Sequence, residues 1–396
     1  MENLVYSHDF VDAFQKLRVG AKDQSPVSGL THQHYKYPAR FSPSFVASAI
    51  DVFSKPNDLV LDPYMGGGTT IIEALASKRR VIGCDVNSLA VFVAKAKTTV
   101  LSDAEADAVE VWALATVGMK YHDDPSGIEE IVCPVRTRNL QLPRARYIKK
   151  IISFGLALCE ELPTENARII ARCSLLSVSQ WALNGRKNSP TLDEFRRKLI
   201  SRTFETLQAT NDLAIKLKDN RFSASDLMLI HDSAEYLPNH LDSSNSTKVD
   251  LVVTSPPYPG VHILYHRWQV DGRRETPAPY WIAGCLDGEG SGYYNFGGRA
   301  KKTLDDYFSA SLITLKAIRR VMREGAIIVQ MIAFSDPRRQ LIRYLENMKL
   351  AGFDELDASS YGTKRIWRQV PNRNWHAETK GATNSSREVV LIHAAI

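Results

Sequence analysis

DLVLDPYMGGGTT, residues 58–70, is the stretch that decides the fold. Its first five residues are an apolar run that ends in an acid, which is typical of a short buried strand. Three consecutive glycines follow, and they permit a tight turn with positive φ. Residues 69–77 (TTIIEALAS) then predict a helix. Strand, glycine-rich turn and helix in this order begin an α/β unit.

The pattern of strand and helix repeats along the chain. Residues 80–85 (RVIGCD) predict a second strand that ends in an acid, and residues 88–98 predict a second helix. This βαβα order indicates a parallel sheet with helices on its faces. Further strands are predicted at 226–231, 250–254 and 326–332, further helices at 304–322 and 338–351, and a terminal antiparallel pair at 364–369 and 388–392.

Strand signals vanish between about residues 103 and 220. Residues 104–119, 167–183 and 192–217 have helical periodicity, and the basic stretch 133–150 contains two prolines. We therefore predict one α/β domain made of residues 1–100 and 221–396. A mostly helical insertion, residues 101–220, interrupts this domain. The Gly- and aromatic-rich residues 258–299 show little regular pattern.

Composition excludes several classes of protein. The 396 residues are 44% hydrophobic and 24% charged, as in an ordinary globular protein with a core. No run of about 18 apolar residues predicts a membrane span, and the N-terminus lacks a signal pattern, so we expect a cytoplasmic protein without membrane contact. The five cysteines form no CxxC pair and have no His cluster beside them, so neither a metal site nor a disulfide framework is expected. The net charge of +6 is too small to identify a partner.

The glycine-rich turn is the first candidate site. The helix after it offers free N–H groups and a positive dipole end, which suit a carboxylate or a phosphate. No Lys-Ser/Thr pair follows the glycines, and their spacing is not G-x-G-x-x-G, which argues against a P-loop and weakens a dinucleotide site. Asp85, at the end of the second strand, can accept hydrogen bonds from ribose hydroxyls. The pair suits a nucleoside that carries an amino acid; the alternative is a plain strand–helix connection with Asp85 as a helix cap.

The second candidate site is Ser255-Pro256-Pro257-Tyr258, which follows the strand at 250–254. Two prolines fix the backbone, so that a carbonyl and the Ser255 hydroxyl can both accept hydrogen bonds from one –NH₂ group. Such bonds localise the nitrogen lone pair for attack on an activated methyl group. Tyr258 offers a flat face on which a base can stack. The alternative is a rigid turn with Tyr258 as a core residue.

Three stretches together resemble one family, the amino-directed DNA methyltransferases. Residues 62–70 resemble its first motif, D-P-F-x-G-S-G-T, and residues 255–258 are the S-P-P-Y form of its catalytic motif. Residues 34–43 (HYKYPARFSP) resemble the segment that precedes the first motif. The resemblance covers roughly residues 30–100 and 225–335 but not the helical insertion. It implies that residues 1–100 and 221–396 form the catalytic domain, and it makes the insertion, residues 101–220, a candidate DNA-recognition element. It implies a class I S-adenosylmethionine-dependent fold, which is Rossmann-like with a mostly parallel seven-stranded sheet.

The resemblance also implies roles for individual residues. Asp62 and the glycines would hold the methionine part of S-adenosylmethionine, Asp85 the ribose, and Asp232 the adenine amino group. The full set of cofactor-binding residues implied in this way is Arg40, Phe41, Asp62, Tyr64, Gly66, Gly67, Gly68, Thr69, Asp85, Val86, Asn87 and Asp232. The catalytic set is Ser255, Pro256, Pro257 and Tyr258.

In this family S-P-P-Y is typical of enzymes that methylate cytosine N4, and D-P-P-Y of those that methylate adenine N6. The resemblance thus implies methylation of cytosine N4 in double-stranded DNA after base flipping, and a cognate restriction or defence partner. Methylation of adenine N6, methylation of an RNA base and non-catalytic binding of nucleic acid stay open as alternatives. The oligomeric state and the recognition sequence are not set by the sequence.

Basic and aromatic residues directly after the catalytic motif are the best candidates for contacting DNA. Arg side chains can bind phosphates or guanine edges, and aromatic rings can fill the gap left by a flipped base. Two other basic stretches, residues 136–150 and 364–375, are weaker candidates, and any such run can be merely a solvated surface. The predicted DNA-binding residues are His262, Tyr265, Arg267, Trp268, Arg273 and Arg274.

Overall fold

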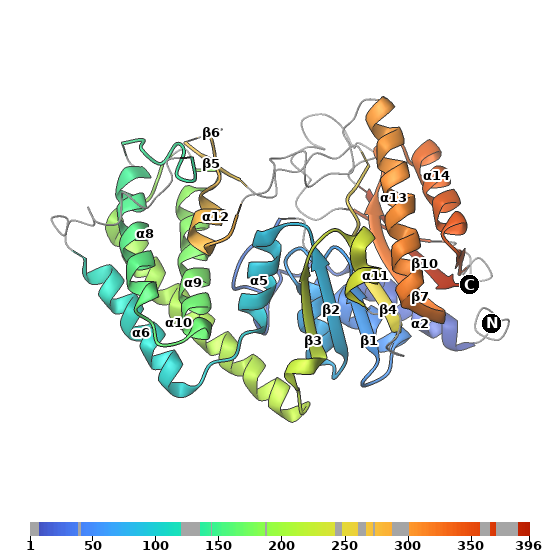
Figure 1. Ribbon diagram of the computed structural model, residues 1–396, viewed down its shortest axis with the longest axis horizontal. Helices are drawn as coiled ribbons and strands as arrows, with labels where there is room; N and C mark the ends of the chain where they lie inside the picture. The colour runs from blue at the N-terminus through green and yellow to red at the C-terminus, as the bar shows by residue number, and fades with distance from the viewer. Residues whose placement is uncertain are drawn as a thin grey trace.

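A central sheet of eight strands organises the protein in the computed structural model (Figure 1). Seven strands follow one path in the order β3-β2-β1-β4-β7-β10-β8, and β9 pairs with β10 beside it. Their bounds are β1 Leu59–Asp62, β2 Arg80–Asp85, β3 Leu227–His231, β4 Val249–Thr254, β7 Met322–Ala333, β8 Phe353–Glu355, β9 Ile366–Gln369 and β10 Arg387–Ala395. The structure describes residues 8–38, 41–119, 135–143, 145–186, 188–241, 248–259, 267–271, 274–286, 301–356, 365–369 and 387–396.

Five strands of the sheet run parallel. β1 pairs in parallel with both β2 and β4, β2 with β3, and β4 with β7. Only at the C-terminal end does the direction change, because β10 is antiparallel to β7, β8 and β9. The predicted mostly parallel sheet is therefore confirmed, and the predicted terminal antiparallel pair is β9 with β10.

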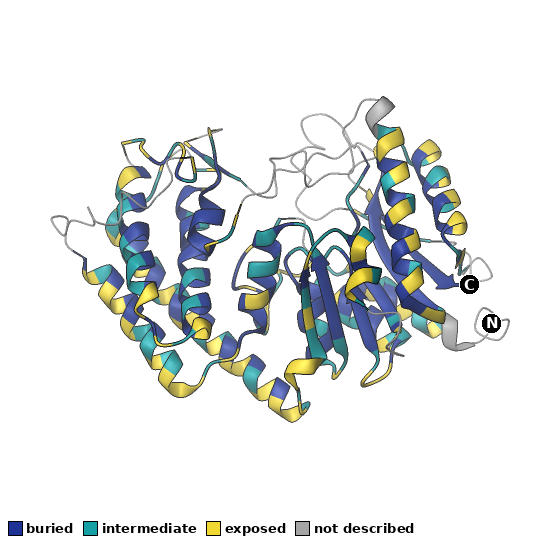
Figure 2. Cartoon of the chain, in the orientation of Figure 1, coloured by how far each residue is buried: buried dark blue, intermediate teal, exposed yellow. Residues whose placement is uncertain are grey.

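Helices cover both faces of the sheet, and its central strands β1 and β4 are almost fully buried (Figure 2). Along β1, Val60 packs into one apolar cluster, whereas its neighbours Leu59 and Leu61 pack into another. The first cluster lies against α2 (His8–Lys22), α3 (Pro43–Phe53), α4 (Thr69–Ala76) and α5 (Ser88–Thr98). The second lies against α11 (Leu237–His240), α13 (Lys301–Val321) and α14 (Pro337–Leu350).

A helical bundle lies beyond α5 (Figure 1). It contains α6 (Asp103–Gly118), α8 (Ala145–Glu160), α9 (Glu165–Leu183) and α10 (Leu192–Asp219). Ser102 and Thr191 begin α6 and α10 with capping boxes, in which Glu105 and Glu194 complete the reciprocal hydrogen bonds. The far end of α10 reaches under the sheet domain, where Leu213 packs with the cluster around α3 and α4. No strand occurs among the described residues from 103 to 219, although the predicted domain boundaries themselves stay a prediction.

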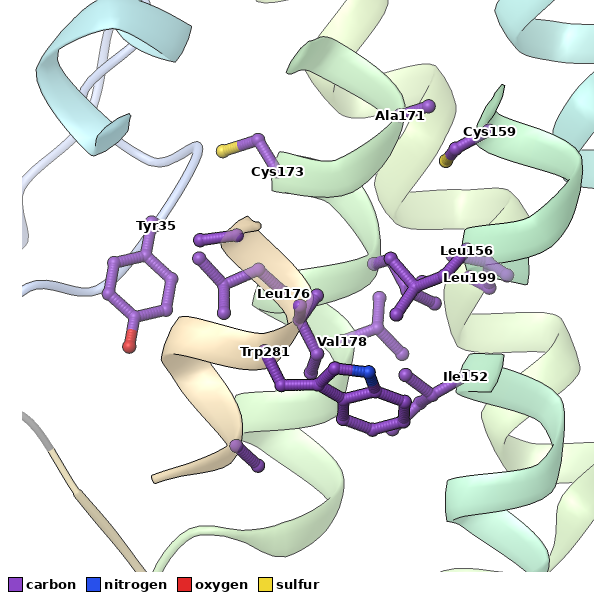
Figure 3. Packing of buried hydrophobic residues seen from close by; sticks show 14 of the residues in the cluster. Tyr35, Ile152, Leu156, Cys159, Ala171, Cys173, Leu176, Val178, Leu199 and Trp281 are labelled. Carbon is purple, nitrogen blue, oxygen red and sulfur yellow. The ribbon is translucent and has the colours of Figure 1, made fainter. Parts of the chain in front are cut away.

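The chain after the S-P-P-Y motif joins this bundle. A short hairpin, β5 (Trp268–Val270) with β6 (Arg274–Thr276), and helix α12 (Ala278–Ala283) lie in the stretch for which the sequence indicated no elements. Trp281 of α12 packs among bundle residues such as Ile152 and Leu176 (Figure 3). Hydrogen bonds also hold the hairpin: Gly185 N–H donates to Gln269 O at 2.8 Å, Gln269 N–H donates to Asn184 Oδ1 at 3.0 Å, and Asn139 Nδ2 donates to Glu275 O at 2.8 Å.

Among the described helices, none combines the length and the apolar character that crossing a membrane requires.

Gly83 in β2 allows the glycine-rich turn to approach the sheet. A Cβ atom at this position would lie 2.5 Å from Met65 Sδ and 2.7 Å from Ile71 Cδ1. We therefore expect Gly83→Ala to lower the free energy of unfolding by about 1–3 kcal/mol through overpacking. Urea denaturation measures this change. Gly118→Ala is the control, since a Cβ there meets nothing within 4 Å and should leave stability unchanged or slightly higher; equal effects of the two substitutions would contradict the packing argument.

Candidate active site

One hydrogen bond joins the ends of two neighbouring strands at the candidate site. Asp62 is the last residue of β1 and Thr254 the last of β4, and the Thr254 hydroxyl donates to Asp62 Oδ1 at 2.7 Å. Both side chains are buried, with Asp62 only 2% exposed. Because β1 and β4 are adjacent and parallel, the turn after β1 and the S-P-P-Y corner after β4 leave the sheet at the same edge.

Asp85 holds the glycine-rich turn against the neighbouring strand. Its Oδ2 accepts a hydrogen bond from Gly66 N–H at 2.9 Å, and its Oδ1 accepts one from Asn87 N–H at 2.8 Å. Burial raises the pKa of Asp85 to about 6. Each carboxylate oxygen has two lone pairs, so the carboxylate retains acceptor capacity beyond these two bonds.

The three glycines allow other parts of the protein to pack closely against the turn, as well as leaving room for a ligand. Gly66 and Gly68 have φ of +46° and +73°, which favour glycine. A Cβ atom at Gly67 would lie 2.8 Å from the Cβ of Tyr37, so the side chain removed here makes room for the N-terminal segment. On the same residue, buried Lys97 donates from Nζ to the Gly67 carbonyl at 2.6 Å. Lys97 was not predicted as a site residue, because in the sequence it is an ordinary lysine of a helix.

Asn87 ties three parts of the chain together. It caps α5 by accepting a hydrogen bond from Leu89 N–H, and it is almost fully buried. Its amide donates to the Tyr37 hydroxyl at 3.0 Å, and its carbonyl accepts from the Tyr280 hydroxyl of α12 at 3.1 Å. The residue predicted beside the adenine thus has a structural network of its own.

The remaining predicted cofactor residues occupy varied positions. Thr69 is buried at the first turn of α4, and the half-buried Val86 accepts from His231 Nε2 at 3.2 Å through its carbonyl. The Tyr64 hydroxyl donates to Thr314 Oγ1 of α13 at 3.0 Å. Phe41 lies in the apolar core, edge-on to Phe45 with ring centroids 5.6 Å apart. Asp232, directly after β3, binds His240 Nε2 at 2.7 Å; Arg40 lies outside the described residues.

The S-P-P-Y corner is held by side chains from distant elements. Ser255 Oγ donates to the Tyr258 hydroxyl at 3.2 Å, and that hydroxyl donates to Glu388 Oε1 of β10 at 2.7 Å. Tyr307 of α13 donates to the Pro257 carbonyl at 2.8 Å. Ser255 and Tyr258 are half-buried, whereas Pro256 is buried. Glu388 and Tyr307 were not predicted from the sequence, since nothing local marks them.

The predicted DNA-binding residues are only partly described. His262, Tyr265 and Arg273 lie outside the described residues. Arg274 is exposed on β6, and Arg267, next to β5, is half-buried with its guanidinium 3.9 Å from Glu275.

Trp268 corrects the sequence prediction of a DNA-facing ring. It is 3% exposed, packs in the bundle core and donates from Nε1 to the Tyr35 hydroxyl at 3.2 Å. The alternation of a strand places Trp268 inward and leaves its neighbours outward. A basic sequence around a tryptophan could not distinguish these two orientations.

Asp62 makes stability depend on pH. Burial raises its pKa to about 6, so the folded protein holds this proton more tightly than the unfolded chain, in which an aspartic acid titrates near 4. This contribution therefore decreases as pH rises from about 4 through 6. The free energy of unfolding of the wild type should decrease between pH 4 and pH 7. We expect this decrease to be smaller in Asp62→Asn, by about 1–3 kcal/mol. Urea denaturation at several pH values tests this, with exposed Asp107→Asn as control; curves of equal slope for wild type and Asp62→Asn would refute it.

Parts of the chain are similar in sequence to known methyltransferases. Residues 11–96 match the DNA methylase family of N6- and N4-directed methyltransferases. The type II methyltransferase M.MvaI of Kocuria varians is 41% identical over 73 residues, which are 18% of this chain and 16% of that protein. The type II methyltransferase M1.MboII of Moraxella bovis is 60% identical over 35 residues, 9% of this chain and 14% of that protein. The chain thus aligns with less than a fifth of the length of either relative.

Two solved structures align with most of this chain at low sequence identity. TrmN from Thermus thermophilus aligns with 90% of this chain and 49% of its own, at 11% identity and a TM-score of 0.32. The rRNA methyltransferase aviRa from Streptomyces viridochromogenes aligns with 91% of this chain and 89% of its own, at 11% identity and a TM-score of 0.37. The segment that carries the glycine-rich turn and Asp85 is the part matched in sequence, and the family implies S-adenosylmethionine as cofactor. Over residues 11–96 the chain is thus similar to the DNA methylase family of amino-directed methyltransferases.

Proposed function

We propose that this protein transfers a methyl group from S-adenosylmethionine to the exocyclic amino group of a base in DNA, with N4 of cytosine as the target atom. The observation that carries the proposal is the hydrogen bond between Thr254 and Asp62. This bond holds the glycine-rich turn, which suits the cofactor, next to the S-P-P-Y corner, which suits an amino group. A DNA substrate also agrees with the cytoplasmic location expected from the sequence.

The residues after β1 and β2 fit S-adenosylmethionine. The free N–H groups and the positive end of α4 suit the cofactor's carboxylate. Asp85, held at the carboxyl end of β2 by Gly66 and Asn87, suits the ribose hydroxyls. Asp232 follows the adjacent strand β3 and would bind the amino group of the adenine. When bound, the cofactor supplies an electrophilic methyl group on its sulfonium.

The S-P-P-Y corner fits an amino group. The Pro257 carbonyl already accepts from Tyr307, so the Pro256 carbonyl is our candidate for the second acceptor beside Ser255 Oγ. Two acceptors would bind both protons of the –NH₂ group and localise its lone pair on the nitrogen. The cofactor would supply the methyl group to this lone pair and keep the electrons of its carbon–sulfur bond, and the methylated nitrogen would release one proton to solvent. Tyr258 would stack on the base after it leaves the duplex.

The choice of cytosine N4 over adenine N6 rests on Ser255. The S-P-P-Y form is typical of cytosine N4 enzymes in the family that the sequence resembles. The names of the two aligned relatives, type II methyltransferases, support action on DNA and a restriction–modification role. A cognate restriction enzyme would be the partner of such a modification enzyme.

A composite surface would bind the DNA. The hairpin β5–β6 follows the S-P-P-Y corner in sequence and is fastened to two loops of the bundle. It carries Arg267 and Arg274, and the loop that holds it carries Arg136 and exposed Arg138. α12 connects this region to the carboxyl end of β2 through Tyr280 and Asn87. We therefore place the DNA across the carboxyl edge of the sheet, against the hairpin and the adjoining loop.

Expression in a host that lacks DNA methylation tests the proposed reaction. We expect mass spectrometry of digested DNA to detect N4-methylcytosine with the wild type and none with Ser255→Ala. With purified protein, Ser255→Ala should lower kcat far more than it weakens cofactor binding in isothermal titration, because Ser255 acts on the amine. Detection of N6-methyladenine instead would show that the target is adenine N6 and not cytosine N4. Absence of any methylated base from the DNA would reject the proposed reaction.

Neutralising the hairpin should weaken DNA binding. We expect conversion of Arg267, Arg273 and Arg274 to Gln to reduce affinity and to flatten its salt dependence, by about 0.9 in log–log slope for each phosphate that the variant no longer binds. Fluorescence anisotropy with a duplex, titrated from low to high salt, measures both. The control converts Lys55, Lys78 and Lys349 to Gln, which removes the same charge just before β1, β2 and β8, at the opposite edge of the sheet. If both triple variants show the same salt slope, the hairpin does not bind the DNA.

A further inference from the structure

We infer that Glu388 is a positioning residue for the proposed reaction: it fixes the direction of the hydrogen bonds at Ser255, so that the Ser255 lone pairs face the target amine. The inference rests on the proposed function and assigns work to a residue that no sequence motif marks. It starts from a chain of hydrogen bonds that runs from Ser255 through Tyr258 to Glu388 and ends on Arg368.

The direction of this chain follows from its far end. Arg368 has only donors, and its Nε donates to Glu388 Oε2 at 2.6 Å. Paired in this way, Glu388 is a carboxylate, which can only accept, so the Tyr258 hydroxyl must donate its proton to Oε1. The Tyr258 oxygen then offers Ser255 only lone pairs. Ser255 therefore donates its own proton to Tyr258, as their separation of 3.2 Å allows.

This arrangement prepares Ser255 to accept. A hydroxyl group has one proton and two acceptor lone pairs. With the proton engaged by Tyr258, both lone pairs can accept an N–H of a bound amine, and no described hydrogen bond occupies them. If Tyr258 instead donated to Ser255, it would compete with the amine for the same oxygen. A carboxylate at position 388 excludes that competition.

The far end of the chain is rigid. Glu388 and Arg368 stand directly opposite each other in the register of β10 and β9, and each side chain is only 8% exposed. Arg368 also donates from Nη1 to the carbonyl of Ala21, next to the end of α2, at 3.3 Å. Glu388 in turn lies opposite Ala333 of β7, the strand that separates β10 from β4. Tyr258 thus reaches from the corner after β4 to a fixed acceptor on the second strand away.

The alternative role for the same pair is a cross-strand ion pair that only stabilises the sheet. The chain contains a matched pair that distinguishes the two roles. Arg365, just before β9, donates to both oxygens of Glu355 on β8, at 2.6 and 2.7 Å, and both side chains are 19% exposed. This pair has the same chemistry and borders the same strand β10, yet the described hydrogen bonds do not connect it to Ser255.

Glu388→Gln reverses the chain with little change in shape. Because Arg368 only donates, the new amide turns its oxygen toward Arg368 and its NH₂ group toward Tyr258. Tyr258 then accepts from Gln and donates to Ser255. We expect kcat to fall about tenfold, the equivalent of one hydrogen bond, while KM for S-adenosylmethionine stays unchanged. Glu355→Gln should leave kcat unchanged, and Glu388→Gln should add no loss of kcat to a Tyr258→Phe variant, because Glu388 acts through that hydroxyl.

A readout without catalysis separates this inference from the proposed function. The ¹³Cζ resonance of labelled tyrosine reports whether a phenol donates or accepts, and Tyr258→Phe identifies the signal of Tyr258. We expect Glu388→Gln to shift that signal and Glu355→Gln to leave it in place. The inference would be overturned if the Tyr258 signal did not move in Glu388→Gln. It would also be overturned if both Gln variants had the same kcat and lost the same thermal stability, because the ion pair would then be purely structural. If Glu388→Gln shifts the signal but the wild type methylates no DNA base, the proposed function alone is rejected.

Discussion

The bond from the Thr254 hydroxyl to the buried Asp62 carboxylate is the constraint around which the site is built. A carboxylate so deeply buried is costly unless donors surround it, and burial raises its pKa to about 6 even with Thr254 and Tyr64 N–H as donors. The parallel pairing of β1 with β4 makes the contact possible, since both strands end at one edge. Motifs almost two hundred residues apart in sequence therefore become neighbours.

The glycine-rich turn is held by contacts with several other elements of the fold. Tyr37 packs against Gly67 from the N-terminal segment, Lys97 binds the Gly67 carbonyl from α5, and Asp85 binds Gly66 from β2. Each partner comes from a different element, so the conformation of the turn is determined several times over. A turn held in this way need not reorganise when a ligand binds beside it, which lowers the entropic cost of binding.

Most of the sheet could be predicted because its strands are continuous apolar runs with helical patterns between them. The helices at 69–76 and 88–98 and the strand at 80–85 lie within a residue of where periodicity put them. Helix α8 was missed because residues 133–150 mix prolines with basic residues, and the apolar face of α8 continues beyond that stretch. The hairpin β5–β6 and α12 were missed because three to six residues give no measurable period. Contacts such as Tyr258 with Glu388 join residues 130 positions apart, and no local pattern encodes them.

Helix α5 is a wall shared by the sheet and the bundle. On one side it packs against α4, β2 and β3, and on the other against α9 and α12. Its residues carry both the hydrogen bond from Lys97 to the turn and the start of the network at Asn87. A substitution that shifts α5 against α9 would therefore also displace Lys97, whose Nζ binds the Gly67 carbonyl. Packing in the bundle and the conformation of the glycine-rich turn are linked through this one helix.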